Sequence, residues 1–172
     1  MCSETRARCE PDAEQPRFHL RVCLAGDRST ISPVVESLME ALREFPCTAA
    51  ADFAIETALR EALANAVVHG CRNDAAQLVE CTLSCNPCGE VHIVVKDPGP
   101  GFDPASVPDP LSEENVRSNH GRGIYLISRL MDRVWFERGG TEIHMVLEPR
   151  LIGASAEAPP LPQPLLEGMV PA

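Results

Sequence analysis

The chain contains 172 residues, of which 44% are hydrophobic, and it carries a formal net charge of −10. That length suits one domain with a real core, since domains usually run to about 100–150 residues. An acidic chain lacks the basic footprint that neutralises phosphates, so we expect no direct nucleic-acid partner. Lys96 is the only lysine and does not follow a glycine-rich loop. A P-loop, which needs Gly-Lys-Ser/Thr, is therefore excluded.

Composition divides the chain into three parts. Residues 1–16 are polar and are expected to form a flexible leader, whereas residues 149–172 contain six prolines and are expected to be a disordered tail. The folded domain is expected at 17–148. No apolar run reaches the roughly 18 residues of a membrane span, and the first residues lack the apolar segment of a signal peptide. We therefore expect a cytoplasmic protein without membrane contact.

The first part of the domain predicts a strand and two helices. Apolar residues alternate with polar ones over 18–24, which predicts a strand with one buried face. Ser32 and Pro33 are a candidate N-cap and first helical residue. Thr48 is the candidate N-cap of a second helix, which runs to Gly70, a residue suited to end it.

The second part of the domain predicts two hairpins separated by a loop and a short helix. Strands are expected at about 77–84, 90–96, 134–136 and 143–147. The stretch 97–121 is longer than a simple connection, which is typical of functional loops, and a helix at 122–132 follows. This order predicts an α+β fold, a two-layer sandwich with helices on one face of a mostly antiparallel sheet.

A carboxylate and an amide share one face of the second helix. Glu61 and Asn65 are four residues apart, at the edge of the apolar stripe. The amide oxygen can bind Mg²⁺, which prefers oxygen ligands together with phosphates and water. The carboxylate can take a proton from an attacking hydroxyl or water. A solvated helix face is the alternative, because this pair is common on such faces.

Two glycine motifs suggest contacts to a nucleotide. Asp97–Gly101 follows directly on a strand, where glycine permits close backbone approach to a ligand and the aspartate can accept a hydrogen bond from the amine of adenine. Gly121–Gly123 opens the third helix, whose free N–H groups and dipole favour phosphate, and Arg122 can add a cation. The alternatives are an ordinary turn and a flexible start of the helix.

The three motifs are specific as an ordered set. Glu-x-x-x-Asn on a helix, Asp-x-Gly-x-Gly after a strand and Gly-x-Gly at a helix start after a long loop together resemble the GHKL ATPase superfamily. Within it, Leu59–Gly70, Gly121–Ile127, Met131-Asp132 and Gly140–Glu142 are similar to anti-sigma factor serine kinases of the RsbW type. The resemblance covers about 17–148.

The resemblance implies a Bergerat ATP-binding fold with ATP and Mg²⁺ as cofactors. In such a site Asn65 coordinates Mg²⁺, Asp97 reads adenine and Glu61 is the general base that activates a serine or threonine hydroxyl. Residues 102–120 form the ATP lid. The nucleotide-binding residues are then Asn65, Asp97, Gly99, Gly101, Gly121, Arg122 and Gly123.

The resemblance also implies a protein kinase that is an anti-sigma factor. Such a protein holds a sigma factor inactive and phosphorylates a STAS-domain anti-anti-sigma factor, often as a homodimer. Phosphoryl transfer needs mainly positioning and charge neutralisation, so this small set of residues suffices. Two alternatives stay open: an ATP-binding regulatory module that sequesters a partner without phosphorylating it, and a switch kinase acting on another STAS-domain protein. Glu61 weighs against the first, because a pure binding module needs no base.

Three cysteines depart from the family pattern. Cys81, Cys85 and Cys88 are candidate zinc ligands, with Cys71 or His92 as a fourth. Ordinary thiols on a strand and turn are the alternative. All eight cysteines are expected to be thiols or metal ligands rather than a disulfide framework, because a cytoplasmic location is expected.

Overall fold

The computed structural model describes residues 18–44, 51–103 and 122–149. The strands are β1 (Phe18–Ala25), β2 (Leu78–Cys85), β3 (Val91–Lys96), β4 (Arg133–Glu137) and β5 (Glu142–Leu147), and the α-helices are α1 (Ile31–Arg43), α2 (Asp52–Asn65) and α3 (Arg122–Leu130). The expected leader, nearly all of the expected tail and lid, and Thr48 lie outside the described residues. No helix in the described ranges is long and apolar enough to cross a membrane.

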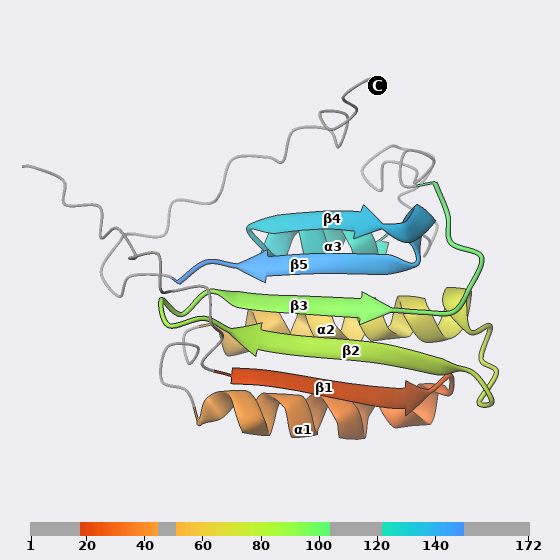
Figure 1. Ribbon diagram of the computed structural model, residues 1–172, viewed down its shortest axis with the longest axis horizontal. Coiled ribbons are helices and arrows are strands. Elements are labelled where there is room, and N and C mark those ends of the chain that lie inside the picture. Colours follow the sequence, from red (N-terminus) through yellow and green to blue (C-terminus); the bar gives the residue numbers. More distant parts are fainter. Residues whose placement is uncertain (1–17, 45–50, 104–121, 150–172) are drawn as a thin grey trace, which may run out of the picture.

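The strands form one antiparallel sheet in the order β1-β2-β3-β5-β4. All three helices lie on the same face of this sheet, with α2 between α1 and α3 (Figure 1). The opposite face of the sheet carries none of the described helices. The predicted α+β fold, a two-layer sandwich with helices on one face, is confirmed.

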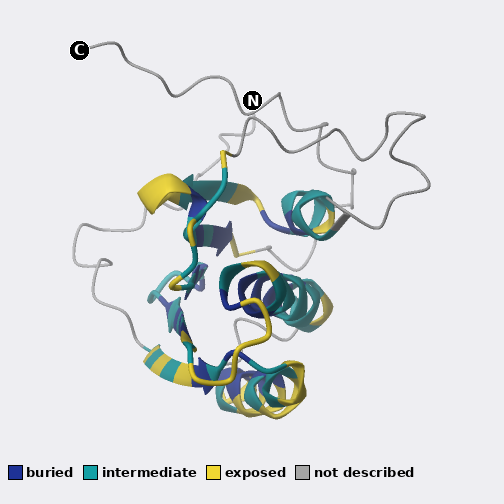
Figure 2. Ribbon diagram, turned by 90° about the vertical axis from the view of Figure 1, so that its right-hand side faces the viewer, coloured by how far each residue is buried: buried dark blue, intermediate teal, exposed yellow. Residues whose placement is uncertain are grey.

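The core fills the space between the sheet and the helices. Residues that alternate along the strands point inward, and on β2 these are Val79, Cys81, Leu83 and Cys85. Helix α2 meets them with Ile55, Leu59 and Leu63, each 0% exposed. Seen along the sheet, buried residues concentrate between the two layers (Figure 2). Because α2 packs against the sheet and lies between α1 and α3, it buries more apolar surface than a helix at the edge and is the central helix of the domain.

The first helix begins earlier than the sequence predicts. Asp27 caps a 3-10 turn (Arg28–Thr30) by accepting a hydrogen bond from Ser29 N at 2.7 Å, and α1 follows without a break. Ser32 is therefore inside α1 and not its N-cap, and its Oγ accepts a hydrogen bond from Arg60 at 3.1 Å. Pro33 is tolerated because residues in a first turn have no intrahelical partner for their N–H.

The second helix reaches Gly70 as predicted, but its last turn is wider than an α-helix. Residues Ala66–Gly70 are π-helical, and Cys71 N donates to Ala66 O, five residues back, at 2.8 Å. Such single π turns interrupt α-helices mostly at functional sites. Here the π turn begins directly after Asn65.

Shortening one buried side chain of the central helix α2 tests this packing. Leu59→Ala removes a side chain that is 0% exposed, so we expect the free energy of unfolding to fall by about 2–5 kcal/mol, as is usual for such a cavity. Phe53→Ala, on the same helix but 76% exposed, is the control and should change it by less than about 0.5 kcal/mol. Urea denaturation measures both, and equal losses would contradict the assigned core.

Candidate functional site

The glycine near the start of α3 lies against both polar residues of α2. A Cβ atom added to Gly123 would stand 2.7 Å from Glu61 Oε2 and 3.3 Å and 3.5 Å from Asn65 Nδ2 and Oδ1. No side chain larger than hydrogen fits there without displacing the Glu61 carboxylate. The structure therefore brings together three predicted site residues that are separated by about one third of the chain.

The chemistry of this group suits a metal-bound phosphate. Glu61 and Asn65 are partly exposed and offer oxygen donors, which is what Mg²⁺ prefers. The first turn of α3 adds backbone N–H groups that have no intrahelical partner, together with the positive end of a helix dipole, and both favour phosphate. The residues present thus fit Mg²⁺ with a nucleotide phosphate.

Asp97 lies at the other end of the π turn, directly after β3. Its backbone N–H donates to Thr141 O at 3.0 Å, which fixes it to the start of β5. Its Oδ1 accepts a hydrogen bond from Gly99 N at 2.8 Å. Burial raises the pKa of Asp97, and the hydrogen bond from Gly99 opposes that rise. Among the described residues no donor is assigned to Oδ2, so this oxygen can accept from a ligand.

Two glycines enclose the Asp97 side chain. A Cβ on Gly70 would stand 2.3 Å from Asp97 Cγ and Oδ1, and a Cβ on Gly99 would stand 2.7 Å from Oδ1 and from Gly70 Cα. Gly99 thus lies against the Asp97 carboxylate, and its role in shaping a nucleotide pocket stays a prediction. Gly70 was predicted only as the end of a helix, and its contact with Asp97 is a role that the sequence pattern did not indicate.

Gly101 carries the chain from the site to the β4–β5 turn. Its φ is +73°, and a Cβ would stand 2.0 Å from Gly139 O, a conformation and a contact that require glycine. The next residue, Phe102, donates its N–H to Gly139 O at 2.9 Å and packs edge-to-face on Phe136 with ring centroids 5.1 Å apart. The first residues after the site are thus fastened to the β4–β5 hairpin.

All the predicted nucleotide contacts stay predictions, and the structure adds no geometry for two of them. Gly121 lies outside the described residues. Arg122 is the first residue of α3, which places it beside Gly123, and its role as a cation is carried by the sequence alone.

The cysteines do not form the predicted zinc site. Cys81 and Cys85 point into the core, where burial raises the pKa of the Cys81 thiol to about 12. Cys88 is disulfide-bonded, so its sulfur is not a thiolate ligand, and the expectation that all cysteines are thiols or metal ligands is wrong for this residue. Alternation along β2 already indicates the reason, because residues 81, 83 and 85 share the buried face.

The fold and the site define a class of protein. An antiparallel sheet covered on one face by helices, with a helical Asn and Glu, a strand-end Asp and a glycine at a facing helix start, is the arrangement of GHKL-type ATP-binding domains. The chain belongs to the family described as "Histidine kinase-like ATPase domain", which matches residues 24–147. None of the curated proteins matches the chain. Family membership makes this an ATP-binding domain.

The raised pKa of Asp97 predicts how stability depends on pH. A carboxyl whose pKa is higher in the folded than in the unfolded state opposes folding once it ionises, so the penalty is absent well below its ordinary pKa of 3.8 and complete above the folded-state pKa. Asp97→Asn removes the penalty and keeps an acceptor for Gly99 N. We expect the variant to be more stable than the wild type at pH 7, with the difference vanishing toward pH 3.

Urea denaturation of both proteins across this pH range is the measurement. Because all other titrating groups are shared, the difference between the two curves isolates Asp97. A variant that is less stable than the wild type at pH 7 would contradict the assignment of burial as the dominant cause.

Proposed function

We propose that the protein is an ATP-dependent serine/threonine protein kinase that acts as an anti-sigma factor. The observation that supports this most strongly is the convergence of the Glu61 carboxylate and the Asn65 amide on Gly123 at the start of α3. A module that only binds ATP needs the amide and the helix end, whereas a kinase also needs a base beside them.

Each site residue has a role in holding the nucleotide. Asn65 would hold Mg²⁺ through its amide oxygen, and the ion would neutralise phosphate charge. The Asp97 Oδ2 would accept a hydrogen bond from the amine of adenine. Gly99 and Gly101 let the backbone approach the base. The N-terminus of α3 binds phosphate, and Arg122 supplies the positive charge that a lysine provides in a P-loop.

Glu61 is the proposed general base. It lies one helical turn before Asn65 on the same face, so it would lie beside phosphates that Mg²⁺ holds at Asn65. As a substrate hydroxyl oxygen forms its bond to the γ-phosphorus, the bond from that phosphorus to the β-phosphate oxygen breaks. Glu61 takes the hydroxyl proton, and ADP leaves with the bond's electron pair.

The proposed partners are proteins. A STAS-domain anti-anti-sigma factor would supply the hydroxyl, a sigma factor would be held inactive, and the kinase would act as a homodimer. The net charge of −10 is compatible with a transcriptional regulator that contacts proteins rather than DNA. Sequestration without phosphorylation, and a switch kinase for another STAS-domain protein, are the alternatives.

Phosphate transfer from labelled ATP to a STAS-domain protein, sought first among the products of neighbouring genes, tests the kinase. The wild-type chain with Mg²⁺ should phosphorylate it, and Glu61→Gln should bind ATP normally but transfer phosphate about 10²- to 10⁴-fold more slowly, the usual contribution of a general base. Glu56→Gln is the matched control, because Glu56 is on the same helix but pairs with Arg60, and it should keep the wild-type rate.

The outcomes separate the candidates. Transfer at the wild-type rate by Glu61→Gln would show that Glu61 is not the base. ATP binding without any transfer would favour the sequestering module, and transfer only to other STAS-domain proteins would favour the switch kinase.

Adenine recognition is tested separately with Asp97→Asn. The substitution presents an amide N–H₂ where the amine of adenine needs an acceptor, and loss of a hydrogen bond to a charged group costs about 1.5–3 kcal/mol. We expect ATP affinity to fall by about 10- to 150-fold, while GTP, which lacks that amine, stays a poor ligand for both proteins. Isothermal titration measures this, and an unchanged ATP affinity would contradict the role of Asp97.

A further inference from the structure

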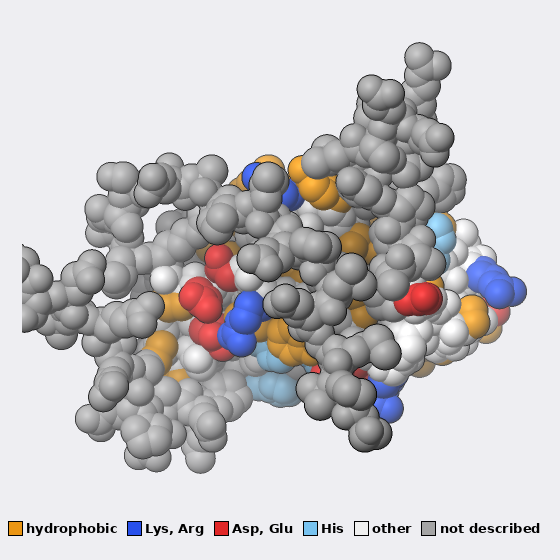
Figure 3. Space-filling view, turned by 90° about the horizontal axis from the view of Figure 1, so that it is seen from above, with side chains coloured by type: hydrophobic (Ala, Val, Ile, Leu, Met, Phe, Trp, Pro, Cys, Tyr) orange, Lys and Arg blue, Asp and Glu red, His pale blue; other side chains and the backbone are white. Residues whose placement is uncertain are grey.

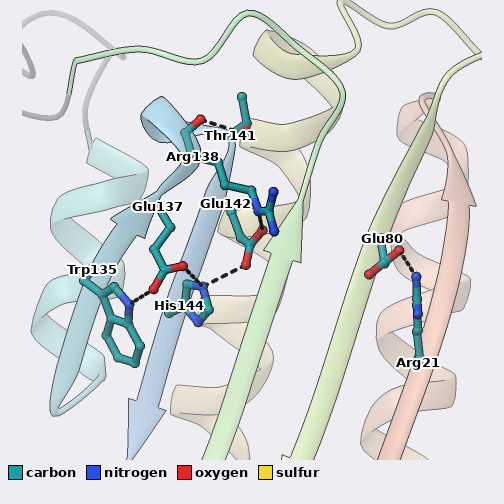
Figure 4. A network of polar contacts seen from close by, with 8 residues as sticks. All are labelled: Arg21, Glu80, Trp135, Glu137, Arg138, Thr141, Glu142 and His144. Atoms are coloured by element: carbon teal, nitrogen blue, oxygen red, sulfur yellow. Dashed lines mark hydrogen bonds and ion pairs between the residues drawn. The ribbon is translucent and has the colours of Figure 1, made fainter.

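A compact group of metal-type ligands lies on the sheet face opposite the helices. Glu142 and His144 are on β5, and Glu137 ends β4 (Figure 4). His144 Nε2 is 3.0 Å from Glu142 Oε1 and 3.7 Å from Glu137 Oε2. Within residues 18–44, 51–103 and 122–149, this is the only group of three such residues whose ligand atoms lie within 4.8 Å of one another.

Both carboxylates are oriented by a second donor. Arg138 Nε lies 2.8 Å from Glu142 Oε2, and Trp135 Nε1 donates to Glu137 Oε1 at 3.0 Å. Each donor occupies one oxygen of its carboxylate and leaves the other oxygen directed at His144 Nε2 (Figure 4). Glu142 Oε1 is hydrogen-bonded to that nitrogen at 3.0 Å, and the ligand atoms of all three residues lie within 4.8 Å of one another.

The imidazole of His144 is held in place by two further rings. Trp135 stacks on it with centroids 4.8 Å apart and planes 13° from parallel. His144 Nδ1 lies 3.3 Å from His92 Nε2. Histidine metal ligands are held in this way through their second nitrogen.

We propose that Glu137, Glu142 and His144 form a binding site for Zn²⁺ or a similar divalent transition metal. Tetrahedral zinc with bonds of about 2.0–2.1 Å places neighbouring ligand atoms about 3.3 Å apart, and the two distances from Nε2, 3.0 and 3.7 Å, lie on either side of that value. Three protein ligands leave a fourth position for water or another donor.

This site differs in place and chemistry from the proposed Mg²⁺-ATP site. A nitrogen donor beside two carboxylates suits zinc better than Mg²⁺, which favours oxygen ligands. The cluster faces away from α2 (Figure 4). The view onto the β4 edge shows that acidic, basic and histidine side chains are interspersed with hydrophobic ones on this side of the domain (Figure 3). A protonated His144 paired with both glutamates is the competing explanation, and it predicts no metal binding.

Trp135 makes the test direct, because it is the only tryptophan of the chain. The full chain, stripped with EDTA, is titrated with Zn²⁺ in excess Mg²⁺, and with Cu²⁺, which quenches fluorescence on contact. We expect one zinc ion bound per chain and saturable quenching of Trp135. His144→Gln and Glu137→Gln should each weaken zinc binding at least about tenfold.

Two substitutions on the same sheet face are matched controls. His19→Gln on β1 and Glu80→Gln on β2, where Glu80 pairs with Arg21 (Figure 4), should keep the wild-type affinity. Co²⁺ separates this site from the cysteines, because thiolate ligands add intense near-ultraviolet bands that a His-Glu site lacks.

Three results would overturn the proposal: no zinc binding by the wild-type chain, unchanged affinity in both ligand variants, or thiolate bands at one equivalent of Co²⁺. If His144→Gln does not fold, Glu137→Gln decides, because that side chain is 52% exposed and its loss leaves the core intact. Zinc should also raise the thermal midpoint of the wild type but not of Glu137→Gln.

Discussion

The geometry of the candidate ATP site depends on the close approach of α3 to α2 at Gly123. Helix α2 is fixed by burial against the sheet and against α1, so its polar edge has one orientation. Gly123 lets the start of α3 lie against Glu61 and Asn65, because a Cβ at this position would displace the Glu61 carboxylate, whose Oε2 would be 2.7 Å away. The buried apolar residues of α2 thus orient Glu61 and Asn65, although none of these apolar residues is itself proposed to bind a ligand.

The π turn Ala66–Gly70 joins the two halves of the site. It begins after Asn65 and ends at Gly70, whose Cα approaches Gly99 and whose missing side chain leaves room for Asp97. One short segment therefore positions both the amide proposed for Mg²⁺ and the carboxylate proposed for adenine. In a π turn each hydrogen bond spans five residues instead of four, so a regular α-helix would place Gly70 at a different angle around the helix axis. The π turn thus explains how Asn65 and Gly70, five residues apart, reach the two halves of the candidate site.

The sequence predicts the elements, and the structure brings the predicted residues Glu61, Asn65 and Gly123 together; the errors of the prediction have physical causes. Alternation and helical stripes predict each strand and α-helix of the described residues to within a few positions, because an element that is buried on one face carries apolar residues at its own period. The predicted N-cap at Ser32 is wrong because Asp27 caps an earlier 3-10 turn.

The contact of Gly70 with Asp97 depends on the π turn, and no local sequence pattern predicts a π turn. The cluster around His144 joins β4, β5 and β3 across the sheet, so it follows from strand register rather than from spacing along the chain. The zinc expectation for Cys81 and Cys85 failed because strand alternation turns both into the core.

The central claim is that α2 supplies the metal-binding amide of an ATP site. The most direct measurement is the affinity for ATP with Mg²⁺ and with EDTA, in the wild-type chain and in Asn65→Ala. The wild type should bind ATP substantially more tightly with Mg²⁺. Asn65→Ala should bind weakly and equally in both conditions, because the oxygen that couples the ion to the protein is gone. An Asn65→Ala variant that keeps the full effect of Mg²⁺ would contradict the account.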